Sequence, residues 1–225
     1  MNIFIFEPHP DDLLFGPGPL LFDWIKEGHN IHVITITDGR AFFRKMRNPP
    51  EEVRKMSEDD VAEMRIEEAK KAIEFLDIPQ ENHHLLYFHD ADGQKYVEEA
   101  IEKTKPLLEE VDRIVLPSDN NSHVDHQAAH DIAIGASQEL KLQDVEFLIY
   151  MVPSYGKFNE DSKEKQFQFK INETLQEKLK EWLEIYQSQK LSKYTWKMFT
   201  WFVNNVDERT YGIFGYQDIG RYHNF

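Results

Sequence analysis

Two short clusters of histidine and aspartate contain the residue types that bind metal ions and transfer protons. One cluster is EPHPDD at residues 7–12, and the other is HVDH at residues 123–126. A catalytic zinc takes about three protein ligands and leaves one position open for water. Because the chain has no cysteine, histidine and carboxylate side chains must supply these ligands. We therefore predict that one zinc ion, or another divalent ion, is bound by His9, Asp12 and His126.

Asp11 lies between two of these ligands in the sequence, and we predict that it is the general base. Pro10 stiffens the loop so that His9 and Asp12 point the same way, which leaves the carboxylate of Asp11 free. A bound metal ion lowers the pKa of its water to about 7, so a nearby carboxylate accepts the proton at neutral pH.

His123 lies about one helical turn from His126, and we predict that it protonates the leaving group or stabilises the oxyanion. Asp125 is predicted to hold the imidazole ring of His123 in its tautomer and orientation. A structural alternative is that Asp125 only N-caps the helix that begins near His126. His130, one turn further on, is interpreted as the next residue on that helix face.

The pattern of apolar residues predicts alternating strands and helices. Strands separated by helical crossovers form a mainly parallel sheet that is covered on both faces. The sequence therefore predicts a doubly wound, Rossmann-like α/β fold. The predicted strands cover residues 2–6, 31–36, 85–88, 113–116 and 145–151, and the predicted helices cover residues 20–27, 57–76, 96–108, 128–140 and 172–187.

Polar residues follow these strands at the edge of the sheet where such folds bind their ligands. The two clusters follow the first and fourth strands, while Asp38 and Asp90 follow the second and third. In the common strand order 3-2-1-4-5 the first and fourth strands are neighbours, so the two clusters face each other. Five histidines lack such a setting and are interpreted as structural or solvated: His29, His32, His83, His84 and His223.

A chain of 225 residues buries one good core, so we predict a single domain over residues 1–225 with an aromatic-rich segment from about residue 190. Residues 41–55 and 156–170 are charged and polar, and we predict surface loops there. For the aromatic residues of the tail we favour core or subunit packing over stacking on a sugar. These residues are Trp196, Phe199, Trp201, Tyr211 and Tyr216.

The charge and the apolar runs narrow the range of partners. A formal net charge of -15, without a block of Lys and Arg, argues against a nucleic-acid partner. No apolar run is long enough for a signal peptide or a membrane span, so we expect a cytoplasmic protein with a small-molecule substrate. A homo-oligomer is compatible with the sequence.

The two clusters, together with three further segments, resemble motifs of the LmbE-like, or PIG-L, family of zinc-dependent N-acetylglucosaminyl deacetylases. PHPDD with Gly16-x-Gly18 is similar to the family's first motif, and HVDH is similar to its HxDH motif. The remaining similarities are ITITDG at residues 34–39, Arg65-x-x-Glu68-Ala69, and Lys178 with Ser188-Gln189. The sequence departs from the family at Leu13, where an acidic residue is frequent, and at Pro19, where glycine is common.

The resemblance implies a hydrolase that removes an N-acetyl or similar N-acyl group from an N-acetylglucosamine-type conjugate. It implies the same zinc ligands, Asp11 as the base that activates water, and His123 assisted by Asp125. It further implies that Arg65 and Asp90 contact sugar hydroxyls. A competing interpretation is that Arg65 forms a helix-surface pair with Glu68 or with charges near Asp60.

Three other interpretations of the sequence remain. Gly16-Pro17-Gly18 after the first strand, with Asp38 after the second, is compatible with a dinucleotide-binding module, although the third glycine is missing. Two histidines and a carboxylate also form the ligand triad of non-haem iron oxygenases. A third interpretation is a metal-binding but inactive scaffold, against which the presence of Asp11 and His123 argues.

Overall fold

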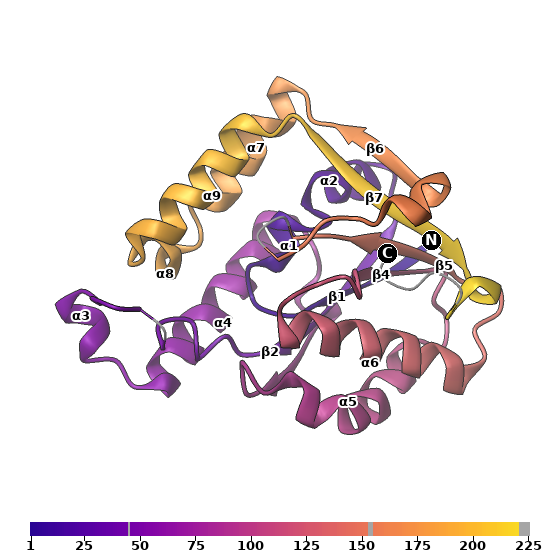
Figure 1. The fold of residues 1–225 in the computed structure, drawn as a ribbon, viewed down its shortest axis with the longest axis horizontal. Helices are drawn as coiled ribbons and strands as arrows, with labels where there is room; N and C mark the ends of the chain where they lie inside the picture. The colour runs from indigo at the N-terminus through magenta and orange to yellow at the C-terminus, as the bar shows by residue number, and fades with distance from the viewer. Residues whose placement is uncertain (45, 153–154, 221–225) are drawn as a thin grey trace.

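The computed structural model describes residues 1–44, 46–152 and 155–220. Within this part of the chain, seven strands form one sheet in the order β3-β2-β1-β4-β5-β7-β6 (Figure 1). The first five strands are parallel and follow the predicted order, whereas β6 and β7 add an antiparallel edge. The strands are β1 (Asn2–Glu7), β2 (Asn30–Thr37), β3 (His83–Phe88), β4 (Arg113–Pro117), β5 (Glu146–Tyr150), β6 (Gln166–Lys170) and β7 (Glu208–Gly215).

Helices cover both faces of the sheet, which confirms the doubly wound α/β fold. Successive side chains of β1 alternate between the faces, with Ile3 and Ile5 in one core and Phe4 and Phe6 in the other. The first core is covered by α1 (Asp12–Phe15), α2 (Gly18–Lys26), α4 (Glu58–Phe75), α7 (Glu173–Leu183) and α9 (Lys193–Asn205). The second is covered by α5 (Val97–Thr104) and α6 (Val124–Leu140), and two further α-helices, α3 (Glu51–Arg54) and α8 (Gln187–Lys190), are short.

The prediction of a surface loop over residues 156–170 was wrong at its end. Residues 166–170 (QFQFK) form β6, where the two phenylalanines are half-buried between more polar neighbours. This strict alternation is typical of a strand with one solvated face. The loop was predicted because the residues before this strand are highly charged.

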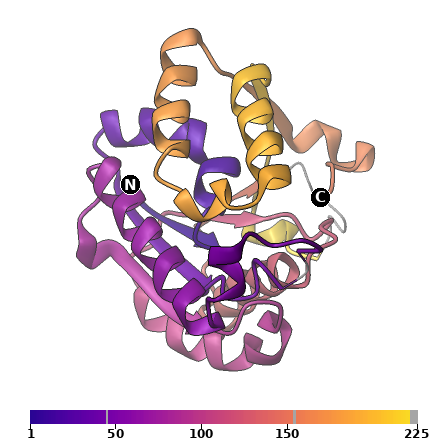
Figure 2. The same ribbon diagram turned by 90° about the vertical axis from the view of Figure 1, so that its left-hand side faces the viewer.

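The aromatic-rich segment from about residue 190, whose apolar residues follow no clear helical or strand period, contains α9 and β7. β7 pairs with β5 and β6, so the end of the described chain belongs to the same sheet as its beginning. Figure 2 shows α7 and α9 side by side. Tyr211 is buried, and Phe199 packs against the core, which confirms core packing for these aromatic residues. Trp201, in contrast, is 60% exposed.

Two further helix boundaries differ from the prediction in ways that affect the site. The helix after β4 begins at Val124 rather than near residue 128, so Asp125 and His126 lie in its first turn. The helix predicted over residues 172–187 ends at Leu183, and α8 follows as a separate short helix. Among the described residues, no helix is long and apolar enough to cross a membrane.

Candidate active site

The loop after β1 is fixed from inside the protein. Glu7 accepts hydrogen bonds from the backbone N–H of Leu13 at 3.0 Å and from the hydroxyl of Thr35 at 2.7 Å. Burial raises the pKa of Glu7 to about 8. The backbone N–H of His9 donates to Asp12 Oδ2 at 3.0 Å. These bonds hold the loop in one shape, so its polar side chains have fixed positions.

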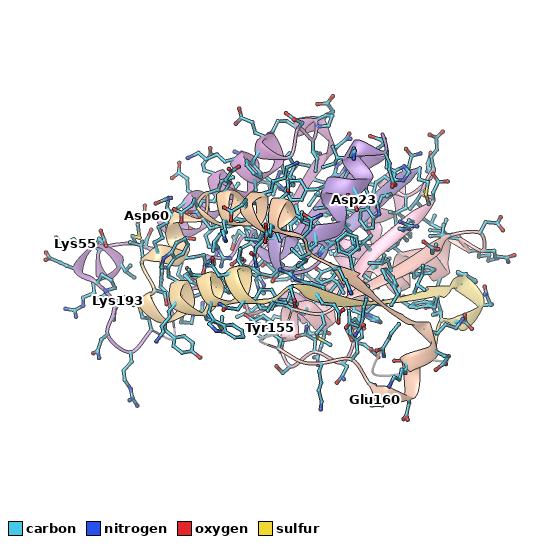
Figure 3. The ribbon with its side chains drawn as sticks, turned by 90° about the horizontal axis from the view of Figure 1, so that it is seen from above. Asp23, Lys55, Asp60, Tyr155, Glu160 and Lys193 are labelled. Carbon is cyan, nitrogen blue, oxygen red and sulfur yellow. The ribbon has the colours of Figure 1, made fainter. Side chains whose placement is uncertain are left out.

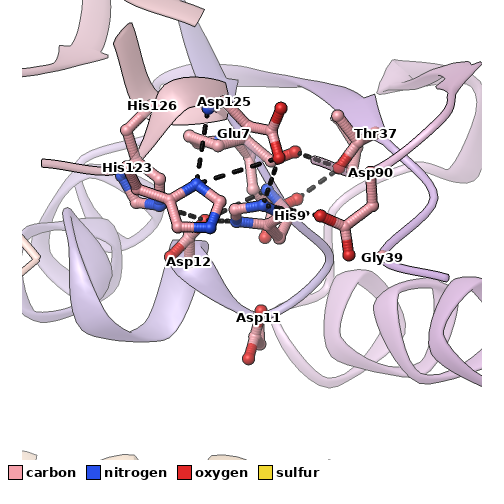
Figure 4. A network of polar contacts seen from close by, with 12 residues as sticks. Glu7, His9, Asp11, Asp12, Thr37, Gly39, Asp90, His123, Asp125 and His126 are labelled. Carbon is pink, nitrogen blue, oxygen red and sulfur yellow. Dashed lines mark hydrogen bonds and ion pairs between the residues drawn. The ribbon is translucent and has the colours of Figure 1, made fainter. Parts of the chain in front are cut away.

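The structure brings the three predicted metal ligands together (Figure 4). Asp12 Oδ2 lies 2.8 Å from His9 Nδ1 and 3.1 Å from His126 Nε2. His126 is fully buried, and its Nε2 makes no hydrogen bond with any described residue, because the approach of Asp12 lacks hydrogen-bond geometry. Asn121 contacts the other ring nitrogen, Nδ1, at 3.2 Å. A buried imidazole nitrogen without a hydrogen-bond partner, 3.1 Å from a carboxylate that also contacts a second imidazole, fits a zinc ligand set.

Further donor atoms surround His9. Its ligand atoms lie within 4.8 Å of those of His123 and His126, and also of those of Asp90 and Asp125. Asp125 is fully buried, and its Oδ2 lies 3.1 Å from His9 Nε2. His9 therefore lies at the centre of a larger cluster of histidines and carboxylates than the sequence predicted.

The charges in this cluster depend on one another. Burial opposes the charged form of His9, but the hydrogen bond and the charge of Asp12 raise its pKa well above the usual value. Burial likewise opposes the charge of Asp12, but His126 and His9 lower its pKa. The carboxylates around His9 therefore favour positive charge at this position. A divalent cation would supply such charge.

Asp11 lies in the same cavity but makes different contacts. Its Oδ1 accepts a hydrogen bond from Arg65, and its Oδ2 accepts one from the side-chain amide of Gln189 at 2.9 Å. Burial raises the pKa of Asp11, although Arg65 works against this shift. Asp11 is thus held by two donors, apart from the hydrogen bonds that join His9 to Asp12.

The contact of Gln189 with Asp11 was missed by the sequence reasoning. Helix α8 is held against α4 by Glu68, which accepts hydrogen bonds at 2.6 Å from both the backbone N–H and the hydroxyl of Ser188. Gln189 is fully buried beside it. In the sequence, Ser188 and Gln189 stand out only through their similarity to the family. No spacing in the sequence indicates a partner 178 residues away.

Arg65 is buried, so the alternative of a helix-surface pair with Glu68 or Asp60 is wrong. Its side chain is 3% exposed, donates to the carbonyl of Gly39 at 3.3 Å, and lies over the ring of Phe42 at 4.8 Å. Gly39 has a φ of 71°, and a Cβ there would meet the guanidinium at 2.8 Å. Arg65 therefore lines the cavity, with Asp11 as its ion-pair partner.

Asp90, predicted to contact a sugar, lies beside the metal-ligand candidates. Its Oδ1 is 3.4 Å from His9 Nε2, and its Oδ2 accepts a hydrogen bond from the backbone N–H of Ala41 at 3.0 Å. Burial opposes its charge, but His9 and Arg65 lower its pKa. Asp90 therefore connects the loop after β2 to the centre of the site.

His123 differs from the prediction in how Asp125 supports it. The backbone N–H of Asp125 donates to His123 Nδ1 at 3.3 Å, whereas the Asp125 carboxylate is 3.8 Å from this atom. The N-cap of α6 is His123, so the alternative in which Asp125 caps this helix is wrong. Burial, together with His9 and His126, lowers the pKa of His123 to about 4. The neutral ring then carries its proton on Nε2.

The carboxylate of Asp125 instead fixes the loop after β3. Its two oxygens accept hydrogen bonds from the backbone N–H groups of Gly93 at 2.7 Å and Ala91 at 2.8 Å. The site is therefore assembled from the loops after β1, β3 and β4, as expected at the carboxyl edge of a doubly wound sheet.

Six polar side chains of the site line a cavity of about 580 Å³: His9, Asp11, Asp12, Arg65, Asp90 and His123. The rest of the lining includes residues of the loop after β2 and of the first two turns of α9. Gly16 and Gly18, which suggested a dinucleotide-binding module, have a packing explanation: a Cβ at Gly16 would meet Tyr150 at 2.4 Å, and one at Gly18 would meet Trp182 at 3.2 Å.

The fold and the donor set define an α/β protein with a candidate metal site at the carboxyl edge of its sheet. The family model for GlcNAc-PI de-N-acetylase (PIG-L) matches residues 4–137, which is more than half of the chain. The chain belongs to this family, as the motifs predicted.

The solved structures that share this fold include several deacetylases. A deacetylase of the teicoplanin biosynthesis pathway is 15% identical with a TM-score of 0.71, and the match covers 96% of this chain and 98% of that one. N,N'-diacetylchitobiose deacetylase from Pyrococcus horikoshii is 20% identical with a TM-score of 0.72, covering 97% and 85%. The fold also occurs in the 4-carboxy-2-hydroxymuconate hydratase GalB from Pseudomonas putida, at 13% identity, a TM-score of 0.58 and 94% coverage of both chains. No curated protein sequence matches the chain.

Proposed function

We propose that this protein is a zinc-dependent hydrolase that removes the N-acetyl group, or a similar N-acyl group, from an N-acetylglucosamine-type conjugate. Family membership and the deacetylase neighbours support an N-deacetylase. The names of these relatives supply the amino-sugar class. His9, Asp12 and His126 would hold one zinc ion. When bound, this ion would polarise the amide carbonyl and lower the pKa of a water molecule.

The chain's own residues divide the proton transfers. Asp11 accepts a proton from the attacking water at one of its carboxylate oxygens, while Arg65 and Gln189 keep the carboxylate oriented. As the C–N bond breaks, Asp11 gives this proton to the amine nitrogen, so the acyl group leaves as the carboxylic acid and the sugar as the free amine. His123 donates a hydrogen bond from Nε2 to the carbonyl oxygen as negative charge develops there. Asp125 positions His123 through its backbone N–H, and any assistance from its carboxylate remains a prediction. Contacts of Arg65 and Asp90 with sugar hydroxyls also remain predictions.

One observation carries this proposal. A buried His126 Nε2 without a hydrogen-bond partner lies 3.1 Å from Asp12, and Asp12 lines the same cavity as Asp11, a carboxylate that two separate donors hold apart from the ligand cluster. A site that only binds a metal has no need of such a second carboxylate. The arrangement supports hydrolysis over an inactive scaffold.

The test is a panel of N-acetylated amino-sugar conjugates incubated with the protein, with release of free amine as the readout. We expect amine release that is lost with a chelator and restored by zinc. A protein that binds about one zinc ion per chain yet releases no amine from any conjugate would instead support the scaffold. The cytoplasmic location and a homo-oligomeric state stay predictions.

A further inference from the structure

The cavity has two chemically different walls. Histidine, aspartate and Arg65 line the end at which the ligand candidates lie. Five apolar side chains of the lining form a second surface, which we call the apolar wall, and Arg44, which also lines the cavity, is 47% exposed and forms an ion pair with Glu58. The wall consists of Phe15, Phe42, Val152, Met198 and Phe199.

Helix α9 contributes most of one side of this wall. Met198 and Phe199 lie one turn after Tyr194 and Thr195, so the four residues share one face of the helix and line the cavity. The hydroxyl of Ser192 fixes the start of α9 by accepting a hydrogen bond from the backbone N–H of Thr195 at 3.3 Å. In Figure 3, α9 runs from Lys193 into the middle of the view, and Tyr155, which also lines the cavity, is drawn close to it.

Contacts behind the wall hold it in place. The rings of Phe15 and Phe199, both in the wall, pack against each other with centroids 3.9 Å apart, and Phe199 also packs against the first core. Tyr194, at the mouth, is 80% exposed. The wall therefore continues from a packed interior to solvent beside α9.

The composition of the wall limits what it can bind. A sugar hydroxyl pressed against Met198 or Phe42 loses its hydrogen bonds to water and gains none, which costs free energy. An alkyl or aryl group placed there removes apolar surface from water at no such cost. The cavity volume of about 580 Å³ lies in the range of sites for drug-sized ligands and leaves room beyond an acetamide group.

We propose that the substrate carries an uncharged alkyl or aryl aglycone, and that Met198 and Phe199 on α9 contact this group. The proposal rests on the proposed function, in which the polar end of the cavity handles the amide of the amino sugar. Met198 and Phe199 lie beyond the segment that the family model matches, whereas Phe15 and Phe42 lie within it.

The test measures equilibrium binding of the deacetylated products, methyl, propyl and hexyl β-glucosaminide, to the zinc-loaded protein by calorimetry. Each fully buried methylene strengthens binding by about fourfold. We expect the hexyl compound to bind at least about tenfold more tightly than the methyl compound. Equal affinities across the series would overturn the proposal.

Variants on α9 locate the effect. Met198→Gln keeps the length of the side chain but makes it polar. In this variant the difference in log Kd between the methyl and hexyl compounds should be at most half of that in the wild type. Met198→Leu should retain the gain. Trp201→Ala is the matched control, because Trp201 is on the same helix, is 60% exposed and is not part of the cavity lining.

An unchanged gain in Met198→Gln, or its loss in Trp201→Ala, would contradict the assignment of the wall. Because the measurement uses product amines at equilibrium, it does not depend on turnover. Absence of amine release with the chain-length effect intact would contradict only the proposed function.

Discussion

Two histidine clusters lie at the same sheet, one beyond its carboxyl edge and the other on β2 and β3, and their neighbours give them opposite properties. In the candidate active site, carboxylates raise the pKa of His9, and His126 has a buried nitrogen without a hydrogen-bond partner. On β2 and β3, His32, His83 and His84 have lowered pKa values because of burial. The residue type is the same in both places. Acidic neighbours make one cluster suited to a cation, and their absence makes the other structural.

The contacts of the second cluster show why it needs no ligand. His32 stacks on Phe4 with ring centroids 4.2 Å apart, and its Nδ1 lies 3.3 Å from His84 Nε2. His83 Nε2 lies 2.9 Å from the hydroxyl of Thr35. Among the described residues, no carboxylate forms an ion pair with these three histidines. Their contacts support the structural interpretation made from the sequence.

The largest expected effect separates the two clusters directly. His126→Ala removes a predicted ligand, so the purified protein should lose most of its zinc and its deacetylase activity. His84→Gln changes the other cluster and should leave zinc content unchanged. Metal analysis of both variants decides the matter. A fully metallated and active His126→Ala would remove His126 from the metal site.

Asp11→Asn should separate metal binding from proton transfer within the first cluster. The variant keeps its shape and loses the base, so kcat should fall by about a hundredfold or more while zinc content stays near wild type. Steady-state kinetics and metal analysis on the same preparation provide the check. Loss of zinc in this variant would mean that Asp11, and not Asp12, is a ligand.

Arg65→Lys tests the two hydrogen bonds that the Arg65 guanidinium donates, one to Asp11 and one to the carbonyl of Gly39. Lysine keeps the charge but cannot bond Asp11 and the carbonyl of Gly39 with the geometry of a guanidinium. We expect kcat/KM for an N-acetylglucosamine conjugate to fall by about thirtyfold or more, which corresponds to about 2 kcal/mol of transition-state stabilisation. Zinc content and Tm should stay near those of the wild type. Arg54→Lys, on exposed α3, is the control. Equal kcat/KM values for Arg65→Lys and wild type would show that the guanidinium geometry of Arg65 is not needed for catalysis.

Gln189→Leu removes the second donor to Asp11 without changing charge. One buried hydrogen bond to a carboxylate contributes about 1.5 kcal/mol, so kcat should fall by about tenfold while KM changes little. Gln187→Leu, two residues earlier in α8 and exposed, should have no such effect. If both variants reduced kcat equally, the effect would come from α8 as a whole rather than from the contact with Asp11.

The second cluster should have the smallest effect on activity, because it changes only the stability of the protein, and only in acid. Burial, with His84 and Lys70, lowers the pKa of His83 to about 4 from 6.5. The unfolded chain therefore binds the proton more readily, and the stability contributed by neutral His83 is present above pH 6.5 and lost as the pH falls toward 4.

His83→Gln should remove this pH dependence while keeping a partner for Thr35. Between pH 7 and pH 5 its Tm should fall less than that of the wild type, by about 4–8 °C, corresponding to about 2 kcal/mol. Thermal unfolding of both proteins at the two pH values provides the measurement. Parallel curves would show that His83 takes no part in acid destabilisation.

The amino-acid sequence by itself determined the parallel half of the sheet and the ligand candidates. Buried parallel strands are continuous apolar runs, and the polar clusters begin where those runs end, so both are visible locally. The alternation in β6 was visible too, but the charged residues before it suggested a loop. α9 and β7 were harder to find, because their aromatic residues pack against several elements and follow no single period.

Only the tertiary structure decided which groups touch Asp11 and what surrounds His9. Gln189 reaches Asp11 because Glu68 on α4 holds α8 in place, a contact between segments that are 120 residues apart. The pKa values of His9 and His83 likewise depend on burial and on neighbours from other parts of the chain, such as Asp125 for His9 and Lys70 for His83. Sequence periodicity records which face of an element is apolar, whereas these properties come from distances between elements that no local pattern encodes.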